Sequence, residues 1–149
     1  MLLYLDNCCY NRPFDDQTQD KIRHEAEAIQ NIIKLAQWYG HTILASRALE
    51  IEIGEINNPV KHRDVLNLYR QSITGTAYYR KATFDYVRPL AVAAGVKGLD
   101  VHHLAFAAAS GADYLLTTDE NFIKAAAGLK LSVKVINPSN FPMGGMIWQ

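Results

Sequence analysis

Short apolar runs alternate with stretches of helical periodicity along the whole chain. The apolar runs end at turn-forming or acidic residues, as buried strands do, and they cover residues 2–5, 42–44, 114–116 and 133–136. Apolar residues recur at helical spacing in the stretches between them, which we expect to be helices at residues 18–39, 46–56, 60–72, 84–94, 100–110 and from 119 onward. Strands that alternate with helices predict an α/β fold with a mainly parallel sheet, built as one domain over residues 1–149.

One segment allows two interpretations. Residues 78–81 read Tyr78-Tyr79-Arg80-Lys81, a mixture of aromatic and basic side chains that is typical of proteins that bind single-stranded nucleic acid. The same residues after the loop at 74–76 also suit a short strand at 78–80, and we favour this half-buried strand.

Composition limits the classes of partner. Lys plus Arg and Asp plus Glu both number 15, so the net charge is zero, whereas nucleic-acid binders often carry a basic excess. Any contact with nucleic acid must therefore depend on local Arg and Lys, on metal ions or on a partner protein. Cys8 and Cys9 are adjacent and form neither a disulfide framework nor a zinc motif, which suits a reducing cytoplasm. No apolar run approaches ~18 residues, so no membrane segment is expected.

Acidic residues stand where two of the predicted strands end. Asp6 follows residues 2–5, and Asp119 comes shortly after residues 114–116. Ligands of open α/β sheets bind at the carboxyl ends of the strands, so these carboxylates meet if the two strands are neighbours. Asp100 begins a predicted helix and is a third candidate. Clustered carboxylates raise each other's pKa and need positive charge, which Mg²⁺ supplies in sites that bind phosphate.

Each acid also has an ordinary structural interpretation. Asp6 suits a turn after a strand, and Asp100 and Asp119 suit helix N-caps, a role that contributes about 1 kcal/mol. A capping carboxylate can still offer one oxygen to a metal. Position alone therefore suggests a carboxylate site without establishing one.

Five short motifs in order resemble those of the PIN-domain family, and within it bacterial VapC-like toxins. The resemblance covers nearly the whole chain and is carried by residues 4–16 (YLDNCCYNRPFDD), 46–53 (SRALEIEI), 98–105 (GLDVHHLA), 117–122 (TTDENF) and 135–141 (VINPSNF). It implies a three-layer Rossmann-like domain with Mg²⁺ or Mn²⁺ held by acids, and hydrolysis of RNA. It also implies that a small antitoxin protein and a second copy of the chain are possible partners.

The resemblance assigns roles to individual residues. Asp6, Glu52, Asp100 and Asp119 would be the catalytic, metal-binding acids, with Glu50 as the alternative to Glu52 if the second motif shifts by two positions. Residues two apart do not share a helix face, so only one of these glutamates is expected to point inward.

Several other residues near these motifs are candidates for supporting roles. The family usually has Thr or Ser after its first Asp, where this chain has Asn7, whose amide can still bind water or a phosphate oxygen. Thr117 either orients a ligand beside Asp119 or satisfies a strand end, and Arg12 is a candidate phosphate contact or an ion-paired arginine. For His103, three residues after Asp100, we favour a packed, hydrogen-bonded role over metal binding.

Three functions compete at this point. The first is a metal-dependent endoribonuclease, the toxin of a type II toxin–antitoxin pair, in which ions activate water and stabilise the leaving oxygen. The second is a PIN-fold module that binds RNA or protein without cutting. The third, a flavodoxin-like nucleotide-binding domain, is disfavoured because residues 6–9 (DNCC) replace the glycine-rich phosphate loop after the first strand.

Overall fold

A five-stranded, entirely parallel sheet organises residues 1–147, the part of the chain that this computed structural model describes. The strand order is β3-β2-β1-β4-β5. The strands are β1 (Leu2–Leu5), β2 (Thr42–Ala45), β3 (Gly75–Thr76), β4 (Tyr114–Leu116) and β5 (Lys134–Ile136). The parallel α/β architecture expected from the alternating pattern is confirmed.

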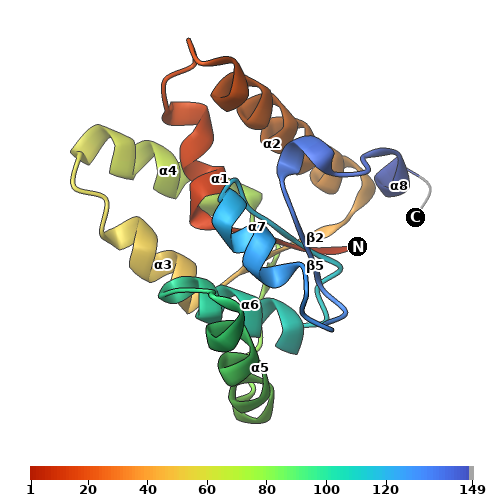
Figure 1. The fold of residues 1–149 in the computed structure, drawn as a ribbon. Coiled ribbons are helices and arrows are strands. Elements are labelled where there is room, and N and C mark those ends of the chain that lie inside the picture. The colour runs from red at the N-terminus through yellow and green to blue at the C-terminus, as the bar shows by residue number, and fades with distance from the viewer. Residues whose placement is uncertain (148–149) are drawn as a thin grey trace.

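Helices lie on both sides of the sheet, with α2 on one side and α5 and α6 on the other (Figure 1). The α-helices are α1 (Asn7–Asn11), α2 (Asp20–Tyr39), α3 (Arg47–Gly54), α4 (Pro59–Ser72), α5 (Lys81–Ala94), α6 (Leu99–Ala109), α7 (Glu120–Ala126) and α8 (Gly144–Ile147). Two short 3-10 helices are η1 (Arg12–Phe14) and η2 (Pro138–Asn140). None of the helices described over residues 1–147 combines the length and the apolar character that crossing a membrane requires.

The central strand β1 is buried on both faces. Leu3, Tyr4 and Leu5 have no exposed surface, which explains why the sequence shows a continuous apolar run here instead of alternation. β1 pairs with β2 on one side and with β4 on the other, and all three run in the same direction. Their carboxyl ends therefore meet at one edge of the sheet, and the residues that follow them are brought together there.

Polar residues just after the strands begin the next helices. Ser46 accepts a hydrogen bond from the backbone N–H of Leu49 and caps α3, and Asp119 accepts from two backbone N–H groups and caps α7. Both caps were expected from the sequence.

The expectation that Asp100 caps α6 was wrong, because α6 begins at Leu99 with Gly98 in the cap position. Gly98 has a φ of 57°, a conformation that a residue with a Cβ adopts only with strain. Asp100 instead lies in the first turn of α6.

Two segments differ from the sequence interpretation. Residues 7–11 form a short helix, α1, because Asp6 accepts a hydrogen bond from the N–H of Asn7 and the helix buries Cys9 and Tyr10. The strand expected at 78–80 is absent, and β3 forms earlier, at Gly75–Thr76, where it pairs with the end of β2. Tyr78 and Tyr79 follow β3 as exposed side chains, 69% and 67% accessible.

Candidate metal centre

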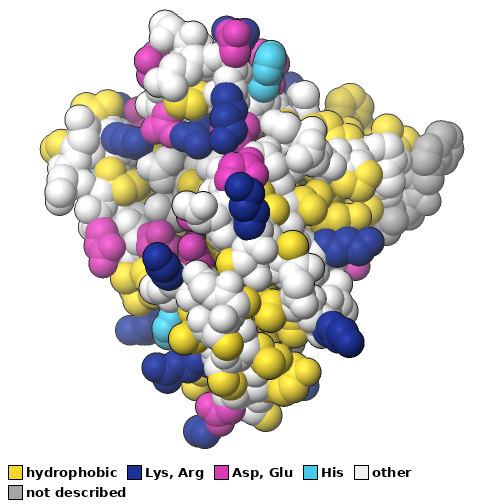
Figure 2. Space-filling view, in the orientation of Figure 1, with side chains coloured by type: hydrophobic (Ala, Val, Ile, Leu, Met, Phe, Trp, Pro, Cys, Tyr) yellow, Lys and Arg dark blue, Asp and Glu magenta, His cyan; other side chains and the backbone are white. Residues whose placement is uncertain are grey.

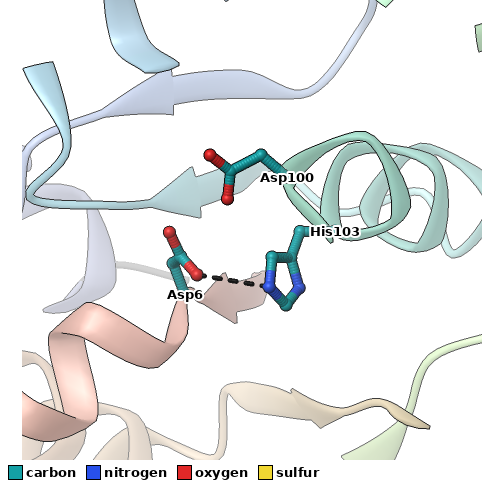
Figure 3. A group of neighbouring side chains, drawn as sticks. All are labelled: Asp6, Asp100 and His103. Carbon is teal, nitrogen blue, oxygen red and sulfur yellow. Dashed lines mark ion pairs between the residues drawn. The ribbon is translucent and has the colours of Figure 1, made fainter. Parts of the chain in front are cut away.

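β1 and β4 are neighbours, so Asp6 and the residues that follow β4 begin at the same carboxyl edge of the sheet. That Asp119 itself meets Asp6 there stays a prediction. Leu5 of β1 lies opposite Leu116 of β4, and the N–H of Asp6 donates to the carbonyl of Leu116 at 2.9 Å. Asp100 reaches the same edge from the first turn of α6. One ligand atom each from Asp6, Asp100 and His103 lies within 4.8 Å of the others, and Figure 3 shows the three side chains facing a common space.

The Asp6 carboxylate is almost completely removed from water, with 4% of the residue exposed. Three groups compensate its charge: Thr117 donates its hydroxyl to Oδ2 at 2.9 Å, the N–H of Asn7 donates to Oδ1 at 2.7 Å, and Nε2 of His103 lies 3.4 Å from Oδ1. Burial nevertheless raises the pKa of Asp6, against the opposing effects of His103 and Thr117.

His103 is fully buried and joins four elements through its two ring nitrogens. Nδ1 lies 2.6 Å from the hydroxyl of Tyr4 on β1, and that hydroxyl lies 2.6 Å from the hydroxyl of Ser46 after β2. Nε2 forms a hydrogen bond with the carboxylate of Glu52 on α3 and also faces Asp6. Burial lowers the pKa of His103, but Glu52, Asp6 and Asp100 outweigh it and raise the pKa overall.

Glu50 and Glu52, the two glutamates of α3, contact different residues. Glu52 meets His103, so it stands beside the cluster of Asp6 and Asp100. Glu50 instead accepts a hydrogen bond from the hydroxyl of Tyr69 at 3.0 Å, in a pocket between α3 and α4. The structure thus places Glu52 at the site and Glu50 outside it, in line with the sequence preference.

Asp100 and Asp119 line one cavity of about 380 Å³, together with Lys97, Asn121 and other residues near the end of α5. Partial burial raises the pKa of Asp100 to about 7, and the charges of Asp6, Asp119 and Glu52 act in the same direction, while His103 opposes them. Asp119 therefore acts on the cluster through its charge, although it is not among the three residues whose ligand atoms lie closest together.

The Lys and Arg residues described form no ion pair with these carboxylates, although Lys97 lines the same cavity as Asp100 and Asp119. Within residues 1–147, the ion pairs made by Asp6, Glu52, Asp100 and Asp119 involve His103 and no Lys or Arg. Arg12, the candidate phosphate contact, is occupied by two other carboxylates, Asp15 at 3.1 Å and Glu25 at 3.0 Å. A contact between Arg12 and substrate remains a prediction.

Two residues have more contacts at the site than their sequence context indicates. His103 was expected to be packed and hydrogen-bonded, and it is, but its ligand atom also faces Asp6 and Asp100; its spacing of three from Asp100 was the available signal. The thiol of Cys8 lies 3.5 Å from Asp6 Oδ2 and 3.3 Å from the hydroxyl of Thr117, and no sequence signal indicated these contacts. Asn7 turns its side-chain oxygen to Asn11, so its amide is partly engaged.

The ligand types fit a divalent cation. Two carboxylates and an imidazole are ligands that Mn²⁺ accepts, and the carboxylates alone also suit Mg²⁺. Ligand atoms on one octahedral ion lie about 3 Å apart when adjacent and about 4.2 Å apart when opposite, so atoms within 4.8 Å of one another must move closer together to share one ion. The hydrogen bond from Nδ1 to Tyr4 is the kind of outer contact that orients a ligating histidine.

Comparison with known proteins gives one informative match. No family model matches the chain, and no curated protein matches it either. A chain from the crystal structure of VapBC2 from Rickettsia felis, bound to a DNA fragment from their promoter, is similar over 92% of this chain and 98% of its own, with a TM-score of 0.59 and 18% identity. The two chains share a fold. At this identity the likeness concerns the fold alone.

The carboxylates that lie close together at the site predict how the free energy of unfolding depends on pH when metal is absent. The pKa values of Asp6, Asp100 and His103 are all raised, so each group contributes stability that is lost as pH rises through its folded pKa. We therefore expect the metal-free protein to unfold at a lower temperature at pH 8 than at pH 5. Asp100→Asn should reduce the corresponding difference in the free energy of unfolding by on the order of 1–2 kcal/mol, since solvent screening weakens the effect at this half-buried group.

Thermal unfolding in the presence of chelator, followed at several pH values, measures this effect. Glu27→Gln on α2 is the matched control, because Glu27 is exposed and lies outside the cluster. A wild-type protein whose melting temperature rises from pH 5 to pH 8 would contradict the arrangement of charges described here.

Proposed function

We propose that this protein is a metal-dependent endoribonuclease of the VapC-like type. The observation that carries the proposal is the convergence of Asp6, Asp100 and His103 at the carboxyl edge of the sheet, with Glu52 alongside. Asp6 is buried and Asp100 and Glu52 are partly buried, and none of the three has a Lys or Arg partner among residues 1–147, so a divalent cation is the natural source of compensating charge.

Each residue of the site has a proposed task. Asp6, Asp100 and His103 hold a Mg²⁺ or Mn²⁺ ion, and that ion supplies the Lewis acid for hydrolysis of a phosphodiester bond. Glu52 contacts Nε2 of His103, the same nitrogen that faces Asp6, so metal binding requires Nε2 to give up its proton and its hydrogen bond to Glu52. Thr117 fixes Asp6. Asp119 adds negative charge in the adjacent cavity, where a second ion or an incoming water can be positioned.

The substrate and the biological role rest on resemblance. The five sequence motifs resemble those of VapC-like toxins, whose substrate is RNA, and the VapBC2 structure shares the fold. We propose that the chain acts on RNA in the cytoplasm as the toxin of a type II pair, controlled by a small antitoxin, and that it pairs with a second copy of itself.

Metal binding should stabilise the folded protein. A ligand at 100 times its dissociation constant adds about 2.7 kcal/mol, which raises the melting temperature of a domain of this size by roughly 5 °C or more. Asp6→Asn should remove most of the shift caused by Mn²⁺, whereas the exposed control Glu27→Gln should keep it. An equal Mn²⁺ shift in wild type and Asp6→Asn, measured by calorimetry, would show that the ion binds elsewhere.

RNA cleavage tests the enzymatic part of the proposal. Wild type with Mn²⁺ or Mg²⁺ should cut RNA to leave 5′-phosphate and 3′-hydroxyl ends, and excess chelator should stop the reaction. Asp119→Asn should lower the rate about 100-fold or more. The fold should survive, because an amide oxygen can still accept from the N–H groups of Asn121 and Phe122 that Asp119 caps.

Glu120→Gln is the control for this experiment, because Glu120 is the next residue, is also acidic and has a half-exposed side chain. It should cleave at close to the wild-type rate. Equal activity in wild type and Asp119→Asn would remove Asp119 from the site. A wild type that binds metal and RNA but cuts no RNA would instead favour a non-catalytic binding module.

A further inference from the structure

A second feature at the carboxyl edge of the sheet is an aromatic–basic segment, residues 78–81. It follows β3, which lies beside β2 in the sheet, and it leads into α5. Tyr78 and Tyr79 are 69% and 67% exposed, and Arg80 and Lys81 are exposed as well. Tyr4 and Tyr10, by contrast, are fully buried.

The two tyrosines are held in place although they are exposed. The ring of Tyr79 packs against Phe84 and Phe106, with centroid distances of 6.1 and 6.4 Å. The N–H of Tyr78 donates to the hydroxyl of Ser110 at 2.8 Å. The Tyr79 ring and the backbone of Tyr78 are therefore positioned before any ligand arrives, which lowers the entropy cost of binding.

A row of rings connects this segment to the first turns of α6. Phe84 lies between Tyr79 and His102, with a centroid distance of 4.9 Å to His102. His102 is exposed and follows Asp100 by two residues in the first turns of α6. The row of rings thus runs from residue 79 to the first turns of α6, the helix that also carries Asp100, although His102 and Asp100 lie on different faces of that helix.

The charges next to the rings are available to an anion. Lys81 pairs with Asp85 at 2.7 Å, but both side chains are more than half exposed, so this pair is weak. Arg80 takes part in no ion pair within residues 1–147. In Figure 2, hydrophobic side chains gather over the lower part of the face, where Figure 1 shows α5, and Lys and Arg side chains border them.

We propose that the aromatic–basic segment, with His102, is a binding platform for single-stranded RNA that leads the strand toward the metal centre. Exposed aromatic faces stack on bases regardless of sequence, and the adjacent guanidinium and ammonium groups contact phosphates. Because the chain has no net charge, such a local platform supplies the attraction that the molecule as a whole lacks. This inference rests on the proposed function for its substrate.

Binding can be separated from cleavage by working with Asp119→Asn. The probe is a fluorescein-labelled single-stranded RNA of about 12 nucleotides, within the usual range of site sizes, and anisotropy with Mn²⁺ present reports its dissociation constant. Tyr78→Ala and Tyr79→Ala should each weaken binding about fivefold or more, as expected when one base stack is removed. Trp38→Ala is the control, since Trp38 is 78% exposed but lies near the end of α2, before β2 begins. It should bind like the parent.

Arg80 and Lys81 are tested through the salt dependence of RNA binding. Replacing Arg80 and Lys81 by Gln should weaken binding and reduce the slope of log Kd against log salt by about 0.7 for each phosphate that the protein no longer neutralises. A 5-iodouridine in the same RNA should form its photo-crosslink in the peptide that contains Tyr78 and Tyr79. Circular dichroism and the Mn²⁺ melting shift of each variant, both unchanged, show that the fold and metal centre are intact.

The outcomes distinguish this inference from the proposed function. If RNA binds through residues 78–81 but wild type does not cleave it, the nuclease function fails and the platform stands. If wild type cleaves RNA and the tyrosine variants bind and cleave with unchanged dissociation constant and KM, the platform is overturned. It is also overturned if Tyr78→Ala and Tyr79→Ala convert a dimer into monomers without weakening the binding of RNA by the monomer, because the segment would then serve a second copy of the chain.

Discussion

The carboxylate of Asp6 is withdrawn from water at the end of the central strand, and the surrounding structure is arranged to tolerate its charge. An uncompensated buried charge costs several kcal/mol. Thr117, the N–H of Asn7 and His103 offset part of that cost, but Asp100 and Glu52 bring further negative charge to the same place. Folding thus produces an electrostatic imbalance that the chain's own Lys and Arg do not correct within residues 1–147. In the proposed function a divalent cation corrects it, and the same cation supplies the chemistry.

His103 connects this imbalance to the rest of the domain. Its Nδ1 ends a short chain of hydroxyl groups through Tyr4 and Ser46, and its Nε2 faces Glu52 and Asp6. Four elements, β1, the end of β2, α3 and α6, are therefore coupled at one imidazole. A nitrogen donor beside carboxylates also has a consequence for metal choice, because imidazole is a poor ligand for Mg²⁺ but a good one for transition ions. The site is thus better suited to Mn²⁺ than an all-oxygen cluster would be.

The sequence predicts the parts of this site that depend on chain direction and strand ends. Asp6 and Asp119 follow apolar runs, so a parallel sheet with adjacent strands necessarily brings them to one edge. Other parts depend on contacts between distant residues. The direction of Glu52 toward His103, 51 positions away, is set by how α3 packs, and the cap of α6 falls on Gly98 because the preceding loop turns there. A strand was wrongly predicted at 78–80 because tyrosines favour strands. The strand that forms is Gly75–Thr76, which has no hydrophobic pattern.

The central claim is that a divalent cation binds between Asp6, Asp100 and His103. Anomalous diffraction from crystals grown with Mn²⁺ locates the ion without reference to activity. The account predicts an anomalous peak within coordination distance of a carboxylate oxygen of Asp6, a carboxylate oxygen of Asp100 and Nε2 of His103. The same crystals of Asp6→Asn should lack the peak. A fully ordered site with no peak there, or a Mn²⁺ ion bound only at other residues, would contradict it.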